Sequence, residues 1–202
     1  MTKIKLCGLS RPCDIEAASG LNPEYIGFVF AKKSKRYVTV EKAKELKRLL
    51  APNIKVAGVF VNEAPETVAA LLNGGVVDIA QLHGAEDENY IKKLRQLTDK
   101  PIIKAFRIET AGDILHIERC TADYILLDSG AGTGRAFDWK LIQDIKRPYF
   151  LAGGLSPDNV ADAITRLNPF AVDVSSGIET DGTKDRTKMA AFVAAVRKEY
   201  RI

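Results

Sequence analysis

The chain predicts an α/β fold in which eight parallel strands close into a (β/α)8 barrel. Short apolar or β-branched runs bounded by Gly, Asn, Asp or Pro recur eight times, and a segment with helical spacing follows each of them. The runs are apolar along both faces, as in a parallel sheet that is covered on both sides. A barrel of this kind needs at least about 200 residues. The 202 residues are therefore expected to form a single barrel domain, residues 1–202, with no appended domain.

The expected strands follow one another along the whole chain. They are KIKLCG (3–8), YIGFVF (25–30), IKVAGVFV (54–61), VVDIAQLHG (76–84), PIIKAFRI (101–108), DYILLD (123–128), YFLAGG (149–154) and FAVDVSSG (170–177). The helices between them are expected near residues 12–20, 41–51, 65–73, 86–97, 110–119, 138–146, 157–166 and 186–199.

Several of these helices carry start signals. Pro12 and Pro157 suit a first helical turn, and Thr39 stands two residues before Glu41, where the second helix is expected to begin. Ser156 or Asp158 is expected to cap the seventh helix.

The composition is that of an ordinary globular protein, with 46% hydrophobic and 28% charged residues. The net charge of +4 is too mild and too dispersed to indicate a nucleic-acid partner. No stretch approaches the roughly 18 apolar residues of a membrane helix, and the first residues lack a secretory pattern. We therefore expect a cytoplasmic protein. Three cysteines without a CxxC pair and two histidines indicate neither a disulfide framework nor a metal site.

Polar residues collect where the expected strands end, which is the face on which barrels of this class build active sites. These residues are Cys7, Arg36, Asn62, Gln81, His83, Arg107, Asp128, Asp173, Ser175 and Ser176.

The loops after the seventh and eighth strands resemble a phosphate clamp. Small residues there let backbone N–H groups approach an anion, and residues 177–180 could add a short helical turn. The residues concerned are Gly153, Gly154, Ser175, Ser176 and Gly177. The alternative is that these glycines only form tight turns.

Two further loops could contact an anion. The basic cluster Lys32, Lys33, Lys35 and Arg36 is either a ligand contact or a solvated loop. The segment SGAGTGRAF (129–137) has GxGxG spacing rather than the GxGxxG of a dinucleotide site, so we interpret it as a lid in which Arg135 could reach the anion.

Cys7 and Asp128 are the candidate reagents, because a thiolate and a carboxylic acid on either side of one substrate can remove and donate a proton. This requires a thiol pKa below its usual value, which a cation-lined mouth would favour. The alternatives are a buried structural cysteine and a capping aspartate. Cys13 and Cys120, both in helical segments, are expected to be buried fillers.

Two other residues remain weaker candidates. His83 is interpreted as a hydrogen-bonded residue of the barrel wall rather than a catalyst. Lys104, in the middle of the fifth strand, could form a Schiff base in an aldolase.

Seven motifs, in order and along nearly the whole chain, make the sequence resemble the phosphoribosylanthranilate isomerase family of tryptophan biosynthesis. They are KLCGLSRPCD (5–14), GFVFAKKSKRYV (27–38), AGVFVN (57–62), QLHG (81–84), LLDSGAGTGRAFDW (126–139), LAGGLSPDNV (151–160) and AVDVSSGIE…GTKD (171–185). Departures from the family pattern are small, at Leu6, Ser10, Ala57 and Arg135.

The resemblance implies an Amadori rearrangement of N-(5-phosphoribosyl)anthranilate without a cofactor. It makes Cys7 the general base and Asp128 the general acid, and it puts Arg36 near the anthranilate carboxylate and Asp173 near the ribose hydroxyl or the bridging amine. Apart from the resemblance, Gln81 and His83 are also expected to bind the substrate, because they stand where the fourth strand ends. Gly154, Ser175, Ser176 and Gly177 fall where the family binds phosphate, in agreement with the clamp.

Other functions remain open at this stage. One is a lyase or synthase barrel that shares the clamp but uses lysine, such as an indole-glycerol-phosphate-synthase-like enzyme or a Schiff-base aldolase. Another is a barrel that binds a sugar phosphate without turning it over. Under the isomerase hypothesis, the small-molecule partner is a phosphorylated aminosugar. The chain itself is expected to be a monomer or a homodimer.

Overall fold

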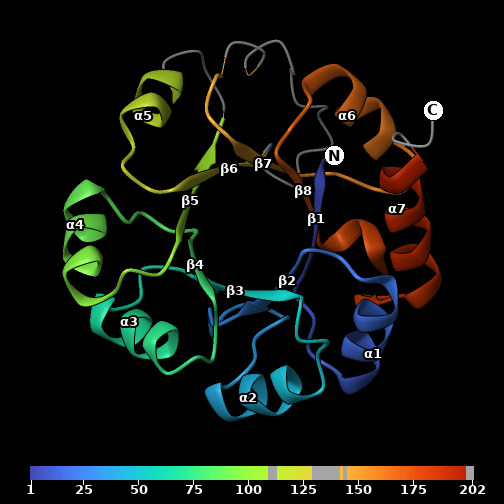
Figure 1. Cartoon of the computed structure of the whole chain (residues 1–202), viewed down its shortest axis with the longest axis horizontal. Coiled ribbons are helices and arrows are strands. Elements are labelled where there is room, and N and C mark those ends of the chain that lie inside the picture. Colours follow the sequence, from blue (N-terminus) through green and yellow to red (C-terminus); the bar gives the residue numbers. More distant parts are fainter. Residues whose placement is uncertain (109–112, 129–141, 143–144, 199–202) are drawn as a thin grey trace.

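The eight expected strands form one closed parallel barrel in the computed structural model of the chain, which describes residues 1–108, 113–128, 142 and 145–198. Figure 1 shows the strands as a central ring with the helices outside it. Each strand pairs with the next in the sequence, and pairing of the last with the first closes the ring. The strands are β1 (Lys3–Cys7), β2 (Tyr25–Val29), β3 (Lys55–Phe60), β4 (Ile79–Leu82), β5 (Ile102–Arg107), β6 (Tyr124–Asp128), β7 (Tyr149–Ala152) and β8 (Ala171–Val174).

The outer ring consists of helices that start close to where the sequence predicts them. They are α1 (Pro12–Leu21), α2 (Val40–Arg48), α3 (Pro65–Asn73), α4 (Glu88–Leu97), α5 (Asp113–Arg119), α6 (Val160–Leu167) and α7 (Arg186–Lys198). Pro12 is the first residue of α1, and the Thr39 side chain accepts a hydrogen bond of 3.1 Å from the backbone N–H of Lys42. Most of the helix expected near residues 138–146 lies outside the described residues.

The seventh predicted helix starts later than expected. It begins at Val160, with Asn159 as its N-cap residue, and neither Ser156 nor Asp158 caps it. The Asn159 side chain accepts a bond of 2.8 Å from the N–H of Ser156 and donates one of 2.9 Å to the carbonyl of Gly154. These two bonds stabilise a turn over the preceding residues, because the amide satisfies backbone groups there that a helix would otherwise use.

Two small elements follow β8. A 3₁₀ turn, η2 (Ser176–Ile178), stands almost where the sequence predicts a short extra helix. It leads into a hairpin of β9 (Glu179–Thr180) and β10 (Thr183–Lys184), which the sequence analysis did not anticipate.

Apolar side chains fill two separate regions. The larger cluster lies between the strands and the helices, and a smaller one fills the inside of the barrel around Phe150. The rings of Tyr25 and Tyr124 meet Phe150 edge-on, at centroid distances of 5.5 and 5.8 Å. Tyr124 and Tyr25 begin their strands, so this aromatic group fills the end of the barrel at which the strands start. The opposite end is left for polar side chains.

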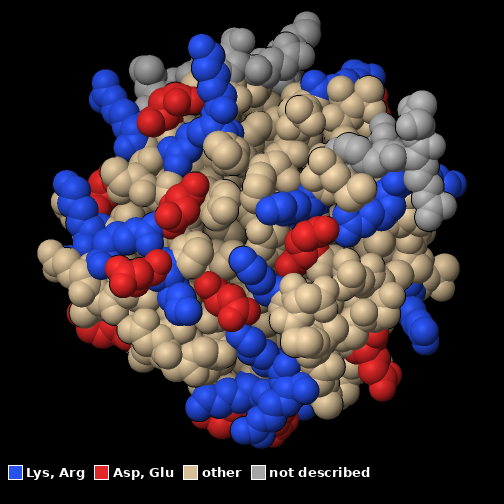
Figure 2. Space-filling view, viewed as in Figure 1, with Lys and Arg blue, Asp and Glu red and all other residues tan. Residues whose placement is uncertain are grey.

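Charge is mixed on the outside of the molecule. Over most of the face shown in Figure 2, basic side chains lie next to acidic ones. Within the described residues, the structure has no helix long and apolar enough to cross a membrane.

Candidate active site

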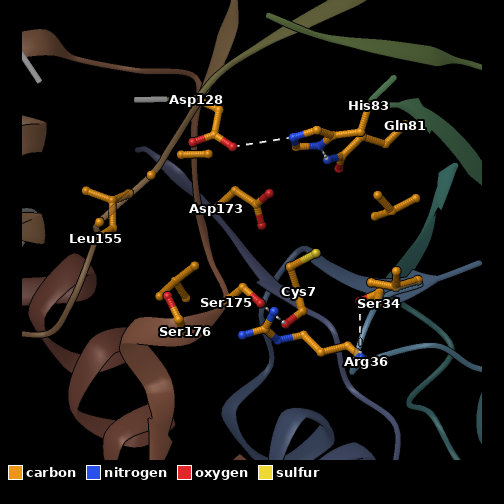
Figure 3. Close-up of a pocket in the computed structure, with 16 residues that line it drawn as sticks. Cys7, Ser34, Arg36, Gln81, His83, Asp128, Leu155, Asp173, Ser175 and Ser176 are labelled. Carbon is orange, nitrogen blue, oxygen red and sulfur yellow. Dashed lines mark hydrogen bonds and ion pairs between the residues drawn. The ribbon is translucent and has the colours of Figure 1, made fainter. Parts of the chain in front are cut away.

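A cavity of about 230 Å³ opens where the strands end. Seven of the eight strands and several of the loops that follow them contribute residues to its lining, and Figure 3 shows the labelled ones around it. Ten residues to which the sequence assigns a catalytic, substrate-binding or phosphate-binding role line it, and Gly177 is the one that does not. The ten are Cys7, Arg36, Gln81, His83, Asp128, Gly153, Gly154, Asp173, Ser175 and Ser176. Asn62 and Arg107, which the sequence also puts at strand ends, are not among the lining residues.

Cys7 is the last residue of β1, and its thiol packs against the apolar side chains of Val29 and Val59. Burial raises its pKa, and the neighbouring ammonium of Lys5 offsets only part of that effect. The expectation of a lowered thiol pKa is therefore wrong for the free site. The cations needed to lower it are present, but the loss of hydration outweighs them.

Lys5 is a site residue that the sequence analysis missed. Its side chain is fully buried inside the barrel, and its Nζ lies 3.0 and 2.9 Å from the two carboxylate oxygens of Asp173. Burial lowers the pKa of Lys5, but the charges of Asp173 and Cys7 outweigh burial, so the net shift is upward and the ammonium stays charged. The available signal was strand alternation, because Lys5 stands two residues before Cys7 and so faces the same side.

Asp128, His83 and Gln81 form one contiguous polar group. The Nε2 atom of His83 lies 3.4 Å from Oδ2 of Asp128, and its Nδ1 lies 2.9 Å from Nε2 of Gln81. Because an amide nitrogen can only donate, Nδ1 is the acceptor, which puts the ring proton on Nε2 and directs it at Asp128. His83 is hydrogen-bonded, as the sequence predicts, and it also lines the cavity.

Gln81 also holds an unused acceptor. Its side chain is 1% exposed, and its Oε1 has no hydrogen-bond partner among the described residues. A buried carbonyl oxygen without a donor is unfavourable, so this atom is suited to a hydroxyl or amine of a ligand.

The two loops of the expected phosphate clamp lie against each other. A Cβ atom on Gly177 would come within 1.9 Å of the carbonyl oxygen of Leu155, so only glycine allows this approach. Gly177 is not itself a lining residue, and its role is to let the β8 loop pack onto the β7 loop. Together they present the backbone of Gly153, Gly154, Ser175 and Ser176 to one side of the cavity.

Arg36 reaches the cavity from the loop after β2, but its guanidinium is already partly engaged. Its Nε and Nη2 donate to the two carboxylate oxygens of Glu179 at 2.6 and 2.7 Å. Glu179 accepts a further bond of 2.6 Å from Nζ of Lys184, which also donates to the carbonyl of Ser175 at 2.8 Å. Glu179 and Lys184 lie in the motif GIE…GTKD, yet the sequence analysis singled out neither of them.

Known proteins match nearly the whole chain. Residues 4–195 match the family model described as N-(5'phosphoribosyl)anthranilate (PRA) isomerase. The chain belongs to the phosphoribosylanthranilate isomerase family. The N-(5'-phosphoribosyl)anthranilate isomerase of Clostridium acetobutylicum is 44% identical over 98% of this chain and 99% of that protein.

Solved structures of the same family superpose over nearly the whole chain. The phosphoribosyl anthranilate isomerase of Thermotoga maritima has a TM-score of 0.90 and 35% identity, covering 98% of this chain and 100% of that one. A second phosphoribosyl anthranilate isomerase structure, in complex with reduced 1-(o-carboxyphenylamino)-1-deoxyribulose 5-phosphate, has a TM-score of 0.87 at 35% identity and the same coverage. The protein is thus a phosphoribosylanthranilate isomerase of tryptophan biosynthesis.

In this isomerase Lys104 has a structural position. Its Nζ lies 2.7 Å from the carbonyl oxygen of Gly84 and 2.9 Å from Oε2 of Glu86, and it is absent from the lining of the cavity. Strand alternation explains this, because Ile103 and Ala105 face the barrel interior and Lys104 faces the helices. The expectation of a Schiff-base lysine there is wrong, and the structure gives the lyase reading no lysine on the described part of the cavity wall.

Two of the remaining expectations concern cysteines. Cys120 is buried, as predicted, whereas Cys13 is exposed, so the filler interpretation of Cys13 is wrong. Cys13 is the second residue of α1, a position that faces away from the barrel. The lid segment with Arg135 lies outside the described residues. Within the described ranges, no three His, Cys, Asp or Glu side chains are grouped so as to hold a metal ion.

Proposed function

We propose that Cys7 and Asp128 are the general base and general acid of this isomerase. The reaction is the Amadori rearrangement of N-(5-phosphoribosyl)anthranilate to 1-(2-carboxyphenylamino)-1-deoxyribulose 5-phosphate. The observation that carries the proposal is that the thiol at the end of β1 and the carboxyl at the end of β6 line one small cavity, with the glycine- and serine-containing loops on its third side (Figure 3). Such a cavity can hold a sugar phosphate between an acid and a base.

In this mechanism Asp128 donates its proton to the ring oxygen of the furanose. The bond between that oxygen and C1′ breaks, and the nitrogen lone pair forms a C=N bond, which gives the open-chain Schiff base. Cys7 then removes the proton from C2′, and the electron pair of that C–H bond moves to give an enolamine. Tautomerisation of the enolamine yields the ketose.

The surroundings of both groups support these roles. A thiolate with a raised pKa forms less readily but is a stronger base once formed, and the ammonium of Lys5 next to it stabilises the charge. The Nε2–H of His83, directed at Asp128 by the bond from Gln81, can stabilise the carboxylate after the proton has left.

The remaining contacts follow the shape of the substrate. We propose that backbone N–H groups of the loops after β7 and β8 bind the phosphate and that Arg36 binds the anthranilate carboxylate. Asp173 is proposed to accept from the ribose hydroxyl or the bridging amine. A related isomerase crystallised with the reduced product analogue, which carries the same phosphate and carboxylate, supports this assignment. A further solved structure is of monomers generated from the isomerase of Thermotoga maritima, which is described as dimeric, and for this chain monomer or homodimer stays a prediction.

The test is turnover of phosphoribosylanthranilate generated in situ, followed by the loss of its fluorescence. Cys7→Ser and Asp128→Asn are each expected to lose at least roughly a hundredfold in rate, the contribution typical of a general acid or base. Cys13→Ser and Asp162→Asn serve as matched controls, because both residues are exposed and lie on the outer helices. Undiminished turnover by both site variants would refute the acid–base assignment, and tight ligand binding without turnover by the wild type would favour the non-catalytic binding barrel.

A further inference from the structure

Arg36 is the residue proposed to recognise the carboxylate of the substrate, but its surroundings raise a question that the family reaction does not answer. A guanidinium on a mobile loop would sample many orientations, and a bidentate contact to a carboxylate requires one of them. The Arg36 side chain is 32% exposed, so packing alone does not fix it. The structure contains three contacts that do.

The first contact is with Glu179, which binds one edge of the guanidinium. Nε and Nη2 donate to the two oxygens of the same carboxylate at 2.6 and 2.7 Å, which is the bidentate geometry that aligns the two planar groups. A guanidinium has five N–H groups. The three that remain are both hydrogens of Nη1 and one of Nη2, and none of the described residues accepts a bond from Nη1. This second edge can bind another carboxylate bidentately.

The second contact fixes Glu179 itself. Its side chain is 9% exposed and accepts a bond of 2.6 Å from Lys184, whose own side chain is 2% exposed. Burial alone would raise the pKa of Glu179, but the hydrogen bonds from Arg36 and Lys184 outweigh it and hold that pKa below its usual range. Lys184 in turn is anchored on the carbonyl of Ser175, in the loop proposed to bind phosphate. The carboxylate of Glu179 is therefore ionised and held in place.

The third contact is with the aliphatic stem of Arg36. A Cβ atom on Gly8 would come within 2.4 Å of Cδ of Arg36, and Gly8 has a φ of +76°. The stem therefore passes over bare backbone directly after Cys7, which limits its rotation. Arg36 lines the cavity and Glu179 does not, so Glu179 occupies the edge of the guanidinium that the substrate does not use.

From these contacts we infer that Glu179 is a positioning residue: it orients Arg36 so that the unused guanidinium edge selects substrates whose arylamine carries a carboxylate. The inference rests on the proposed role of Arg36 and goes beyond it, because Glu179 does not line the cavity. Lys184 links this orientation to the β8 loop, because it pairs with Glu179 and donates to the carbonyl of Ser175.

The direction in which Glu179→Gln changes the affinity for an anionic ligand separates this orienting role from a purely electrostatic one. Arg36, Lys184 and Glu179 together carry one net positive charge, and Glu179→Gln raises this to two. If Glu179 acted only through its charge, the variant would bind an anionic ligand more tightly. If Glu179 orients Arg36, the variant binds the carboxylate-bearing ligand more weakly despite the added positive charge.

The experiment compares two unreactive ligands by titration calorimetry. One is reduced 1-(o-carboxyphenylamino)-1-deoxyribulose 5-phosphate, and the other is the same compound without the carboxyl group. Both share the phosphate, so the ratio of their affinities reports on carboxylate recognition alone. For Glu179→Gln we expect a loss of at least roughly tenfold with the first ligand and less than about threefold with the second, since a misaligned charge-assisted bidentate contact affects one ligand only.

Two further variants complete the design. In an Arg36→Ala background, Glu179→Gln is expected to change the affinity ratio no further, because the group that it orients is gone. Glu179→Asp keeps the charge on a shorter stem and is expected to lose less affinity for the carboxylate-bearing ligand than Glu179→Gln. It also keeps the test available if Glu179→Gln fails to fold. Glu24→Gln is the matched control, since Glu24 is bound by Arg197 at 2.9 Å at the start of β2, at the other end of the barrel.

The outcomes distinguish the inference from the proposed function. If the wild type binds both ligands equally, the carboxylate role of Arg36 fails, and with it the proposed substrate contact. If the wild type prefers the carboxylate ligand and Glu179→Gln keeps that preference, binds it more tightly, or weakens both ligands equally, the positioning role of Glu179 is refuted. A KM increase for phosphoribosylanthranilate with an unchanged kcat in Glu179→Gln would agree with the inference.

Discussion

Lys5 offers the sharpest test of how the barrel interior is stabilised, because its ion pair with Asp173 is buried on both sides. The exposed fractions of the two side chains are 0% and 7%, and Nζ lies 2.9 Å from the nearer oxygen. Lys5→Met keeps most of the volume of the side chain and removes the charge. The carboxylate of Asp173 is then left in the interior without its cation.

The expected cost follows from that geometry. Breaking a buried pair by removing one partner destabilises a protein by about 3–5 kcal/mol, since the remaining charge stays desolvated and uncompensated. For a chain of this size the melting temperature shifts by about 2–4 °C per kcal/mol, so we expect a fall of about 6–20 °C. Replacing both partners, as in Lys5→Met with Asp173→Leu, removes the orphaned charge and is expected to recover most of the loss.

Urea unfolding followed by far-ultraviolet circular dichroism measures these free energies. A Lys5→Met protein within about 1 kcal/mol of the wild type would refute the reasoning, since surface-like ion pairs have that magnitude. A double variant as unstable as the single one would also contradict it, because the loss would then come from packing. The pH profile of thiol alkylation is a second measurement, made in a Cys13→Ser background since Cys13 is exposed. Because the Lys5 ammonium lowers the pKa of Cys7, its removal is expected to move that profile to higher pH.

Two other predictions follow from Lys104 and Tyr149. Lys104 is bound to Glu86 outside the cavity, so borohydride added with substrate is expected to trap no covalent adduct on the protein. For the same reason, Lys104→Arg is expected to keep its turnover. A lysine adduct found by mass spectrometry would contradict this. Tyr149 donates a hydrogen bond of 2.8 Å to the carbonyl of Leu167, and burial raises its pKa to about 12. The unfolded chain loses this proton near pH 10, whereas the folded chain loses it only near pH 12. The stability that Tyr149 contributes is therefore complete below pH 10. It falls by about 2–3 kcal/mol as the pH rises toward 12. The difference in unfolding free energy between the wild type and Tyr149→Phe is therefore expected to shrink between pH 9 and pH 11.5, and an unchanged difference would show that the hydroxyl does not titrate as described.

Much of the architecture could be read from the chain because it depends on local periodicity. Eight apolar runs with helical segments between them require a parallel sheet covered by helices, and their number and the chain length favour closure. Once the strands are placed, the barrel brings every strand end to one face. Cys7 and Asp128 are far apart in the sequence, yet this rule alone predicts that they share a cavity, and both line it.

The expectations that proved wrong depended on contacts beyond one element. Lys104 was assigned by residue type, and the register of β5 turns it toward Glu86 instead. The pKa of the Cys7 thiol depends on a balance between burial and nearby cations, and a sequence does not show which is larger. The late start of α6 came from a side-chain bond of Asn159 that competes with the helix.

The sequence by itself determined the barrel, the face that carries the site and the residue types available there, because alternation and turn residues act over a few neighbouring positions. Only the tertiary structure decided which charges meet. Lys5 with Asp173, His83 with Asp128, and Arg36 with Glu179 and Lys184 each join residues from different strands or loops. The energy of such pairs depends on distances of a few ångströms and on the water removed around them, and both are set when the eight strands close into a ring.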